Sequence, residues 1–215
     1  MATTTLTPDS ANALNPDLDH DTLGHLLSLA YPDAEPGRDF RTGHIVDDDT
    51  GARVGSAVIL DWQVDAPFPT PDQLNDMLDA HRDAVEAFAR ERANRALRHA
   101  VDAERDRRIA AGFVFNGVVY QSRAADRENI AGAATAALGA MIAGAEAGDY
   151  RWHDGDSDFV WIAADNSTHK MDAATLYALG QAALAHKQAH IFAARALKDR
   201  PAIPADFASD IHWPE

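Results

Sequence analysis

The sequence predicts an α+β fold with a small N-terminal β-hairpin module, a long central helix and a C-terminal domain of hairpin, helix, hairpin and helix. Three observations support this order. Two β-rich runs flank the turn cluster 47–51, and a second pair flanks Asn116-Gly117, a dipeptide typical of tight hairpins. Between them a helix start at Thr70-Pro71 is followed by no Gly or Pro until Gly112, which predicts one continuous helix.

Composition sets limits on the class of protein. The chain has 215 residues, of which 46% are hydrophobic and 25% charged, so disorder along its whole length is not expected. It contains no Cys, which excludes a disulfide framework and thiolate metal sites. The formal net charge of −15 would repel a phosphate backbone, so we expect no nucleic-acid partner. The sequence also shows no signal peptide and no apolar run of about 20 residues, so membrane insertion is not expected.

The N-terminal part divides into an arm and a module. Residues 1–20 are polar and contain few large apolar groups, which predicts a flexible arm. Residues 21–69 form the predicted module, which begins with a short helix over 21–30. In its hairpin, residues 44–46 pair with the run 53–64, and Pro67 and Pro69 end the second strand.

Residues 70–111 form the predicted central helix. Thr70 and Gln73 have the spacing of a capping box, in which each side chain bonds to the backbone N–H of the other residue. A set of apolar and aromatic positions then recurs at spacings of four and three residues, as in the seam of a coiled coil: Leu74, Leu78, His81, Val85 and Phe88. This seam is short, since Arg92 and Arg95 follow in the next seam positions. The helix is predicted to be the shaft of a homo-oligomer, with a trimer favoured.

Residues 112–200 form the predicted C-terminal domain. After the hairpin at Asn116-Gly117, an Ala- and Gly-rich helix is expected over 130–148. A second hairpin is expected to join 150–152 to 159–162 around the Asp-rich turn between them. Asp172 can cap a last helix that ends before Pro201 and has one apolar face. Residues 201–215 lack a helical or strand period and are predicted to form an irregular arm.

Two patterns raise the question of a metal site. Asp154, Asp156 and Asp158 alternate like the first ligands of a calcium loop, but Phe159 occupies the position that needs Gly. A solvated turn explains the same residues. His186 and His190 are four residues apart, a spacing that allows two imidazoles to bind one zinc ion, but they also fall on the apolar face of the last helix. We therefore predict no metal, cofactor or catalytic residue, with these five residues as the weak metal candidates.

A family resemblance covers about residues 107–200. The segments that carry it are GFVFNGVVYQS (112–122), Asn129-Ile130 with the Ala-rich helix, and WIAADNSTHKMDA (161–173). In these segments the chain resembles the family called domain of unknown function 4376, which is found near the C-terminus of bacteriophage and prophage tail proteins. The resemblance transfers no catalytic residue, because the family has none established. It implies a phage-tail setting, with localisation in the virion after synthesis in the host cytoplasm.

The expected function is therefore that of a non-enzymatic structural component of a bacteriophage tail, either a tail fibre or a tail-tip or baseplate accessory protein. Its partners would be other phage tail proteins and further copies of the chain. Two alternatives stay open: a tail-assembly chaperone that is absent from the particle, and a metal-dependent virion hydrolase that uses His186 and His190.

The acidic charge is unevenly distributed along the chain. Residues 1–71 contain 12 acidic and 3 basic residues, whereas residues 72–111 contain 9 and 8. Residues 112–215 contain 13 and 8. The N-terminal module is thus the most acidic part, which favours a basic surface on the tail as its partner.

Overall fold

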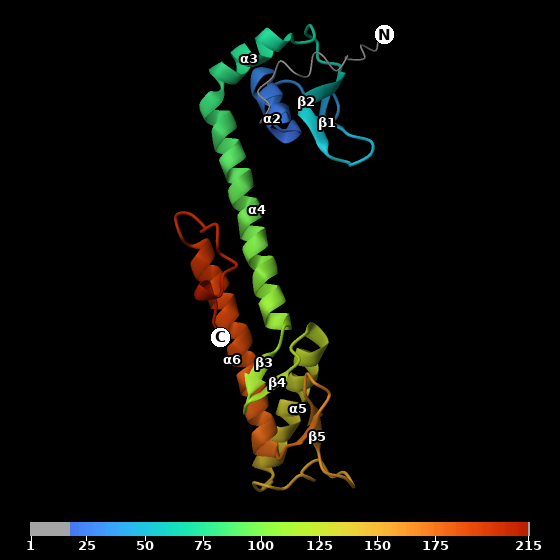
Figure 1. Cartoon of the computed structure of the whole chain (residues 1–215), viewed down its shortest axis with the longest axis vertical. Helices are drawn as coiled ribbons and strands as arrows, with labels where there is room; N and C mark the ends of the chain where they lie inside the picture. Colours follow the sequence, from blue (N-terminus) through green and yellow to red (C-terminus); the bar gives the residue numbers. More distant parts are fainter. Residues whose placement is uncertain (1–17, 215) are drawn as a thin grey trace. The chain divides into compact units, whose positions relative to one another are not determined.

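The computed structural model describes residues 18–214 and is drawn in Figure 1. The chain divides into two compact units with the boundary between Asn94 and Arg95, which lies within helix α4 (Arg82–Ala110). The described residues form five α-helices, three antiparallel two-stranded hairpins and one short 3-10 helix. The mixed α+β class predicted from the sequence is therefore confirmed. Most of the predicted arm 1–20 lies outside the described residues.

The N-terminal unit is built from α2 (His20–Ala30) and a hairpin of β1 (Phe40–Val46) and β2 (Arg53–Trp62). Asp19 caps α2, since its carboxylate accepts a hydrogen bond of 2.8 Å from the backbone N–H of Thr22. Asp47 holds the hairpin turn by accepting bonds of 2.8 Å and 2.7 Å from the N–H and hydroxyl of Thr50. The predicted N-terminal hairpin is confirmed, with a longer first strand than expected.

The core of this unit lies between α2, the hairpin and the two helices that follow. Leu23, Leu26 and Leu27 on one face of α2 are completely buried. They pack with buried side chains from the rest of the unit, namely Leu18, Phe40, Ala57, Ile59, Leu74 and Val85. Leu18, Asp19 and His20 are thus ordered parts of the unit and not, as predicted, the end of a flexible arm.

The central helix is broken, which corrects the prediction of one helix from 70 to 111. Helix α3 (Pro71–Ala80) begins with the predicted capping box, but His81 leaves helical geometry, with φ −114° and ψ 16°, before α4 starts at Arg82. No Gly or Pro marks the break. The bend allows Leu74 of α3 and Val85 of α4 to reach the same core, so tertiary packing outweighs the local preference for a straight helix.

The C-terminal unit begins with the last four turns of α4 and a short hairpin of β3 (Phe113–Phe115) and β4 (Val118–Tyr120). Asn116 and Gly117 both have positive φ, 50° and 78°, as the predicted primed turn requires. Gly112 also has positive φ, and a Cβ there would lie 2.6 Å from the carbonyl oxygen of Tyr120. This hairpin is confirmed at the predicted residues.

The second hairpin of this unit differs from the prediction. Strand β5 (Val160–Ile162) pairs with β6 (Thr168–Lys170) and not with residues 150–152. The turn between β5 and β6 has Asn166 at φ 67°, and the Asp165 carboxylate accepts a 2.9 Å bond from the N–H of Ser167. This compact turn completes its own hydrogen bonds, whereas residues 150–158 form successive turns.

Two antiparallel helices complete the unit. Helix α5 (Ala124–Ile142) starts and ends earlier than predicted, and α6 (Ala173–Lys198) has the predicted Asp172 cap, with a 2.8 Å bond from the N–H of Thr175. Figure 1 shows them side by side. The predicted apolar face of α6 is confirmed: its buried positions are Leu176, Leu179, Ala183, His190, Ala194 and Leu197.

The C-terminal segment is irregular, as expected, apart from the 3-10 helix η1 (Asp210–His212), but it is packed onto the unit. Trp213 is buried with Val101 of α4 and with Ala194 and Leu197 of α6. Its indole N–H donates a 2.7 Å bond to the Phe207 carbonyl, and the Arg108 guanidinium lies 5.3 Å from its ring centroid. Residues 201–214 are therefore part of the C-terminal unit, and the separate arm of the prediction is corrected.

Replacement of Trp213 by Ala tests this packing. Removing a buried indole leaves a cavity, so the free energy of unfolding of the C-terminal unit should fall by about 3–5 kcal/mol. Urea unfolding followed by circular dichroism measures the change. The matched control is Ile211→Ala, since Ile211 is 78% exposed in the same segment and its truncation should leave the transition unchanged. Equal effects of the two substitutions would contradict the proposed packing.

Candidate functional site

The close contact between α5 and α6 creates an apolar surface feature of the C-terminal unit. Gly180 of α6 faces Ala134 of α5 so closely that a Cβ added at Gly180 would lie 2.5 Å from the Ala134 Cβ. On the inner side of the pair, Ile130 and Ala137 of α5 and Leu179 of α6 are buried in the core. The outer side has no third layer among the described residues.

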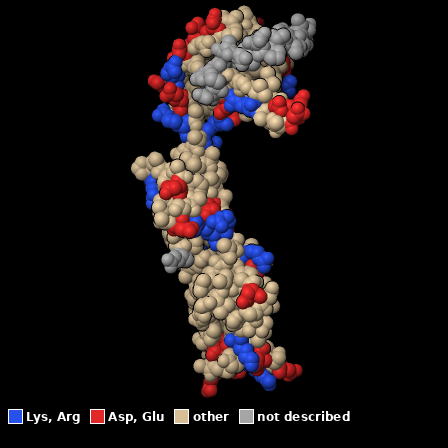
Figure 2. All heavy atoms as spheres, viewed as in Figure 1, with Lys and Arg blue, Asp and Glu red and all other residues tan. Residues whose placement is uncertain are grey.

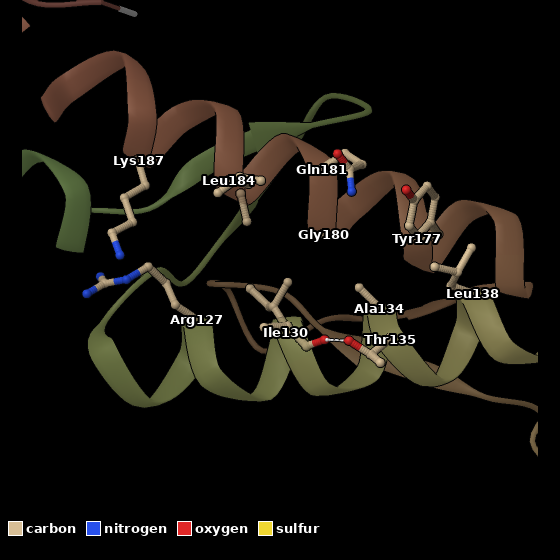
Figure 3. Close-up of a pocket in the computed structure, with 12 residues that line it drawn as sticks. Arg127, Ile130, Ala134, Thr135, Leu138, Tyr177, Gly180, Gln181, Leu184 and Lys187 are labelled. Atoms are coloured by element: carbon tan, nitrogen blue, oxygen red, sulfur yellow. Dashed lines mark hydrogen bonds between the residues drawn. The ribbon is translucent and has the colours of Figure 1, made fainter. Parts of the chain in front are cut away.

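A groove of about 420 Å³ runs between the two helices (Figure 3). Ile130, Ala134, Gly180 and Ala183 line it together with longer side chains, which are Arg127, Thr135, Leu138, Tyr177, Gln181, Leu184 and Lys187. The Thr135 hydroxyl is turned back to the helix, where it donates a 2.8 Å bond to the Ala131 carbonyl. The groove therefore offers mainly apolar contacts.

Further apolar side chains are exposed on both helices beyond the ends of the groove. Leu138 and Leu184 at the groove are 39% and 58% exposed, and Ile142 and Ile191 are 81% and 41% exposed. Ile142 follows Leu138 by four residues and Ile191 follows Leu184 by seven, so each pair lies on one side of its helix. We call these four residues the groove face. A row of large exposed apolar side chains of this kind is typical of an interaction surface.

Charge is concentrated at one end of the groove. The side chains of Arg127 and Lys187 point toward one another there in Figure 3. The Arg127 guanidinium donates a hydrogen bond to the Ser122 carbonyl, and no carboxylate pairs with Lys187 among residues 18–214. Elsewhere around α5 and α6, uncharged residues cover most of the face shown in Figure 2. A partner that brings a carboxylate to this end and apolar side chains to the groove would complement both features.

The structure places the predicted oligomer seam inside one chain. Leu74 and Val85 are 6% and 5% exposed and belong to the core of the N-terminal unit, and Leu78 packs against that core. The Phe88 ring stacks on His25 of α2, with centroids 4.1 Å apart, and His81 occupies the helix break. The assignment of these five residues to contacts between copies is therefore corrected, because α2 and the hairpin occupy the space that a second helix would need.

His186 and His190 lie close together but do not form a metal site with a third ligand. Their ring centroids are 4.4 Å apart, and Nδ1 of His190 lies 2.9 Å from the His186 carbonyl oxygen, to which it must donate. His190 is buried and stacks near Trp213, while the His186 ring lies beside Phe113. Both histidines therefore act as packing residues, and no group of three or more His, Asp or Glu suited to a metal occurs in residues 18–214.

The three alternating aspartates form a turn rather than a ligand set. Asp158 is paired with Lys170 at 2.9 Å and with Arg151 at 3.4 Å, and its hydrogen bond to Lys170 lowers the pKa of the carboxyl group. Asp154 has a positive φ of 60°, which points to a turn position. Asp156 is exposed and makes no ion pair or side-chain hydrogen bond within residues 18–214. The solvated-turn interpretation accounts for this segment.

The groove face was missed by the sequence reasoning, although a signal was present. Helix α6 has a second apolar row, Tyr177, Leu184 and Ile191, which is rotated by roughly 120° from its predicted core face. Apolar residues on two sides of a helix indicate a second packing surface in addition to the core face. In α5 the many Ala and Gly residues hide the same pattern, because small side chains suit either a core or a surface.

Comparison with known families gives the class of this chain. The family described as domain of unknown function (DUF4376) matches residues 92–212, which is more than half of the sequence. The chain therefore belongs to this family. A second family, described as XkdW protein, matches residues 23–86. No curated protein matched the chain, and no solved structure did.

The two matches agree with the two structural units, because the boundary at residues 94–95 lies close to the start of the DUF4376 match and beyond the end of the XkdW match. The family match is longer than the resemblance predicted at 107–200, and it includes the second half of α4 and most of the C-terminal segment. The first 106 residues lay outside the predicted resemblance, and the XkdW match covers residues 23–86 of them. Both families are phage-associated, and the chain is a phage-related protein. None of the described helices is long and apolar enough to cross a membrane.

The partly buried His186 predicts a pH dependence. Burial, together with neighbouring His190 and Arg127, lowers the pKa of His186 below its ordinary value of 6.5. Below that value the unfolded chain binds more protons than the folded chain, so the free energy of unfolding should fall as pH is lowered from about 7 to about 5. His186→Gln should reduce this loss in urea unfolding of the C-terminal unit. The control is His153→Gln at an exposed position, and equal pH slopes for both variants would contradict the prediction.

Proposed function

We propose that this chain is a non-enzymatic structural component of a bacteriophage tail, either a tail fibre or a tail-tip or baseplate accessory protein. The observation that carries the proposal is the division into two units, each matched by a phage-associated family. The exposed groove face supports a role based on protein contacts. A DUF4376 unit that leaves a large apolar surface uncovered is suited to assembly with other chains.

The groove face is the surface through which we propose that copies of the chain associate. Leu138, Ile142, Leu184 and Ile191 would lose contact with water when a second copy packs against them, and each fully buried side chain of this size contributes roughly 1.5–3 kcal/mol. The favoured trimer stays a prediction, now assigned to this face and no longer to the helix seam.

Two charged substitutions test this association. The wild-type chain should show a light-scattering mass that is a multiple of one chain, and Leu138→Asp with Leu184→Asp should reduce it to one chain. A carboxylate in the groove would be desolvated without a partner in the assembly, whereas in the free chain it stays in water.

The matched control for this experiment is Val114→Asp, because Val114 is 67% exposed in the same unit but does not line the groove. It should leave the mass unchanged. A wild-type chain that is monomeric at micromolar concentration, or a control that dissociates equally, would refute the role of the groove face.

The N-terminal unit is the part that we propose to dock on the rest of the tail. Its charge supports this assignment, since residues 1–71 have 12 acidic and 3 basic residues and would be attracted to a basic surface. The second candidate function is a tail-assembly chaperone, which the phage-associated families favour equally. It differs in that a chaperone leaves before the particle is complete.

Peptide mass spectrometry of purified virions distinguishes the two candidates. A structural component should give peptides from both family-matched segments, 23–86 and 92–212, in particles purified through a density gradient. A lysate from the same infection serves as the positive control for detection. Peptides in the lysate but none in intact virions would reject the structural role and support the chaperone.

A further inference from the structure

A second hollow of the C-terminal unit lies between the start of α5 and strand β5. Its volume is about 420 Å³, which falls within the range of small-molecule sites. Gln121 and Arg123 precede α5, Asp126 and Asn129 belong to its first two turns, and Trp161 is the central residue of β5. We call this hollow the Trp161 pocket. It shares no lining residue with the groove between α5 and α6.

Trp161 differs from the other tryptophans in its hydrogen bonding. Three indole N–H groups donate to backbone carbonyls of the chain: Trp62 to Ala66 at 2.9 Å, Trp152 to Met171 at 3.1 Å and Trp213 to Phe207 at 2.7 Å. The Trp161 N–H donates to no acceptor in residues 18–214, and it is not among the buried unpaired atoms, so solvent reaches it. A half-buried indole usually finds a partner for this group. Part of the Trp161 ring packs against the core and lies beside Phe159, with centroids 6.3 Å apart, so the exposed remainder of the ring and the unused donor are what Trp161 offers to a ligand.

The amide side chains of the pocket are also incompletely paired. Gln121 donates from Nε2 to the Ala163 carbonyl at 3.1 Å, which fixes the amide and leaves its oxygen free to accept. The exposed Asn129 makes no side-chain hydrogen bond with the described residues, so it has two donors and one acceptor available. The pocket thus presents donors and acceptors beside an aromatic ring.

The charged groups of the pocket compensate each other. Arg123 Nε lies 2.8 Å from the Asp126 carboxylate, which also accepts a 2.9 Å bond from the Arg123 backbone N–H. The ion pair has no net charge, so it does not attract a free anion such as phosphate. It still offers oriented N–H donors and a carboxylate acceptor to a neutral polar ligand.

We propose that the Trp161 pocket binds a pyranose ring of a carbohydrate. A sugar ring has an apolar face of C–H groups, which fits against an indole, and a rim of hydroxyls that each donate and accept. The unpaired groups of Gln121, Asn129 and Trp161 and the neutral pair of Arg123 with Asp126 match that rim. A short peptide is the competing ligand, because its backbone N–H and C=O groups can also pair with these side chains, but it does not present a rigid face of C–H groups with a rim of hydroxyls. The inference goes beyond the proposed structural function and does not depend on it.

The test is a titration of the full chain with the methyl glycosides of glucose, galactose and N-acetylglucosamine. Binding is followed through the indole N–H signals in a nitrogen-15 correlation spectrum, where the loss of one signal in Trp161→Phe assigns Trp161. We expect a saturable shift of that signal with at least one sugar, with a dissociation constant on the order of 1 mM for a single ring. The other three indole signals should not move.

Asn129→Ala is the informative variant, because Asn129 is exposed and has no side-chain partner among the described residues whose loss would unfold the unit. It should weaken sugar binding about tenfold, the effect of one lost hydrogen bond. Asn75→Ala, the same substitution at an exposed position of α3, should leave binding unchanged.

Three results would overturn the proposal. The first is the absence of a Trp161 shift with all three sugars. The second is equal binding by wild type and Asn129→Ala. The third is a saturable shift with the peptide Gly-Val-Gly but with none of the sugars, which would assign the pocket to a peptide. None of these measurements depends on virions or on the oligomeric state of the chain. A negative result for sugar binding would therefore leave the proposed structural function untouched, and the reverse also holds.

Discussion

The C-terminal unit depends on the close approach of α5 and α6. Gly180 permits this approach, because any larger side chain would collide with the Cβ of Ala134. Small residues at the contact bring the helix backbones together, so larger residues on either side can meet. Ile130 and Leu179 belong to the core that the helices form with the two short hairpins, Ile130 also lines the groove, and Leu138 and Leu184 border it. Core and groove are thus two consequences of one packing contact.

A pair of helices covered on one side by three-residue strands cannot bury every apolar side chain of both helices. The inner rows are buried, whereas Ile142 is 81% and Leu184 58% exposed. Among the described residues nothing covers this side. The groove face is therefore the part of the unit where association would remove the most apolar surface from water, and this is why the proposed assembly is assigned to it. The Trp161 pocket has a different character, since some of its polar groups are unpaired and its charges compensate one another.

The N-terminal unit shows how one pattern can support two interpretations. The spacing of Leu74, Val85 and Phe88 fits a seam between helices of different chains. The same spacing also presents these side chains to α2 and the hairpin of their own chain, and the bend at His81 brings α3 and α4 onto that core. Periodicity shows which side of a helix is apolar, but it does not show what covers that side. The ion pairs of Arg92 with Asp19 and Asp21 further attach α4 to the start of α2.

The sequence by itself determined the features that rest on local chemistry. The capping box at Thr70, the Asn116-Gly117 turn and the buried face of α6 all follow from bonds or spacings within a few residues. The resemblance also indicated the family, although with narrower bounds than the match at 92–212. Only the tertiary structure decided the bend at His81, the pairing of β5 with β6, the packing of Trp213 onto α4 and α6, and the position of the groove and the Trp161 pocket. The β5–β6 pairing is local, but it depends on which of two neighbouring turns closes a hairpin. The other features bring together residues that are distant in sequence or depend on which of two apolar rows finds a partner, and neither is encoded in a local pattern.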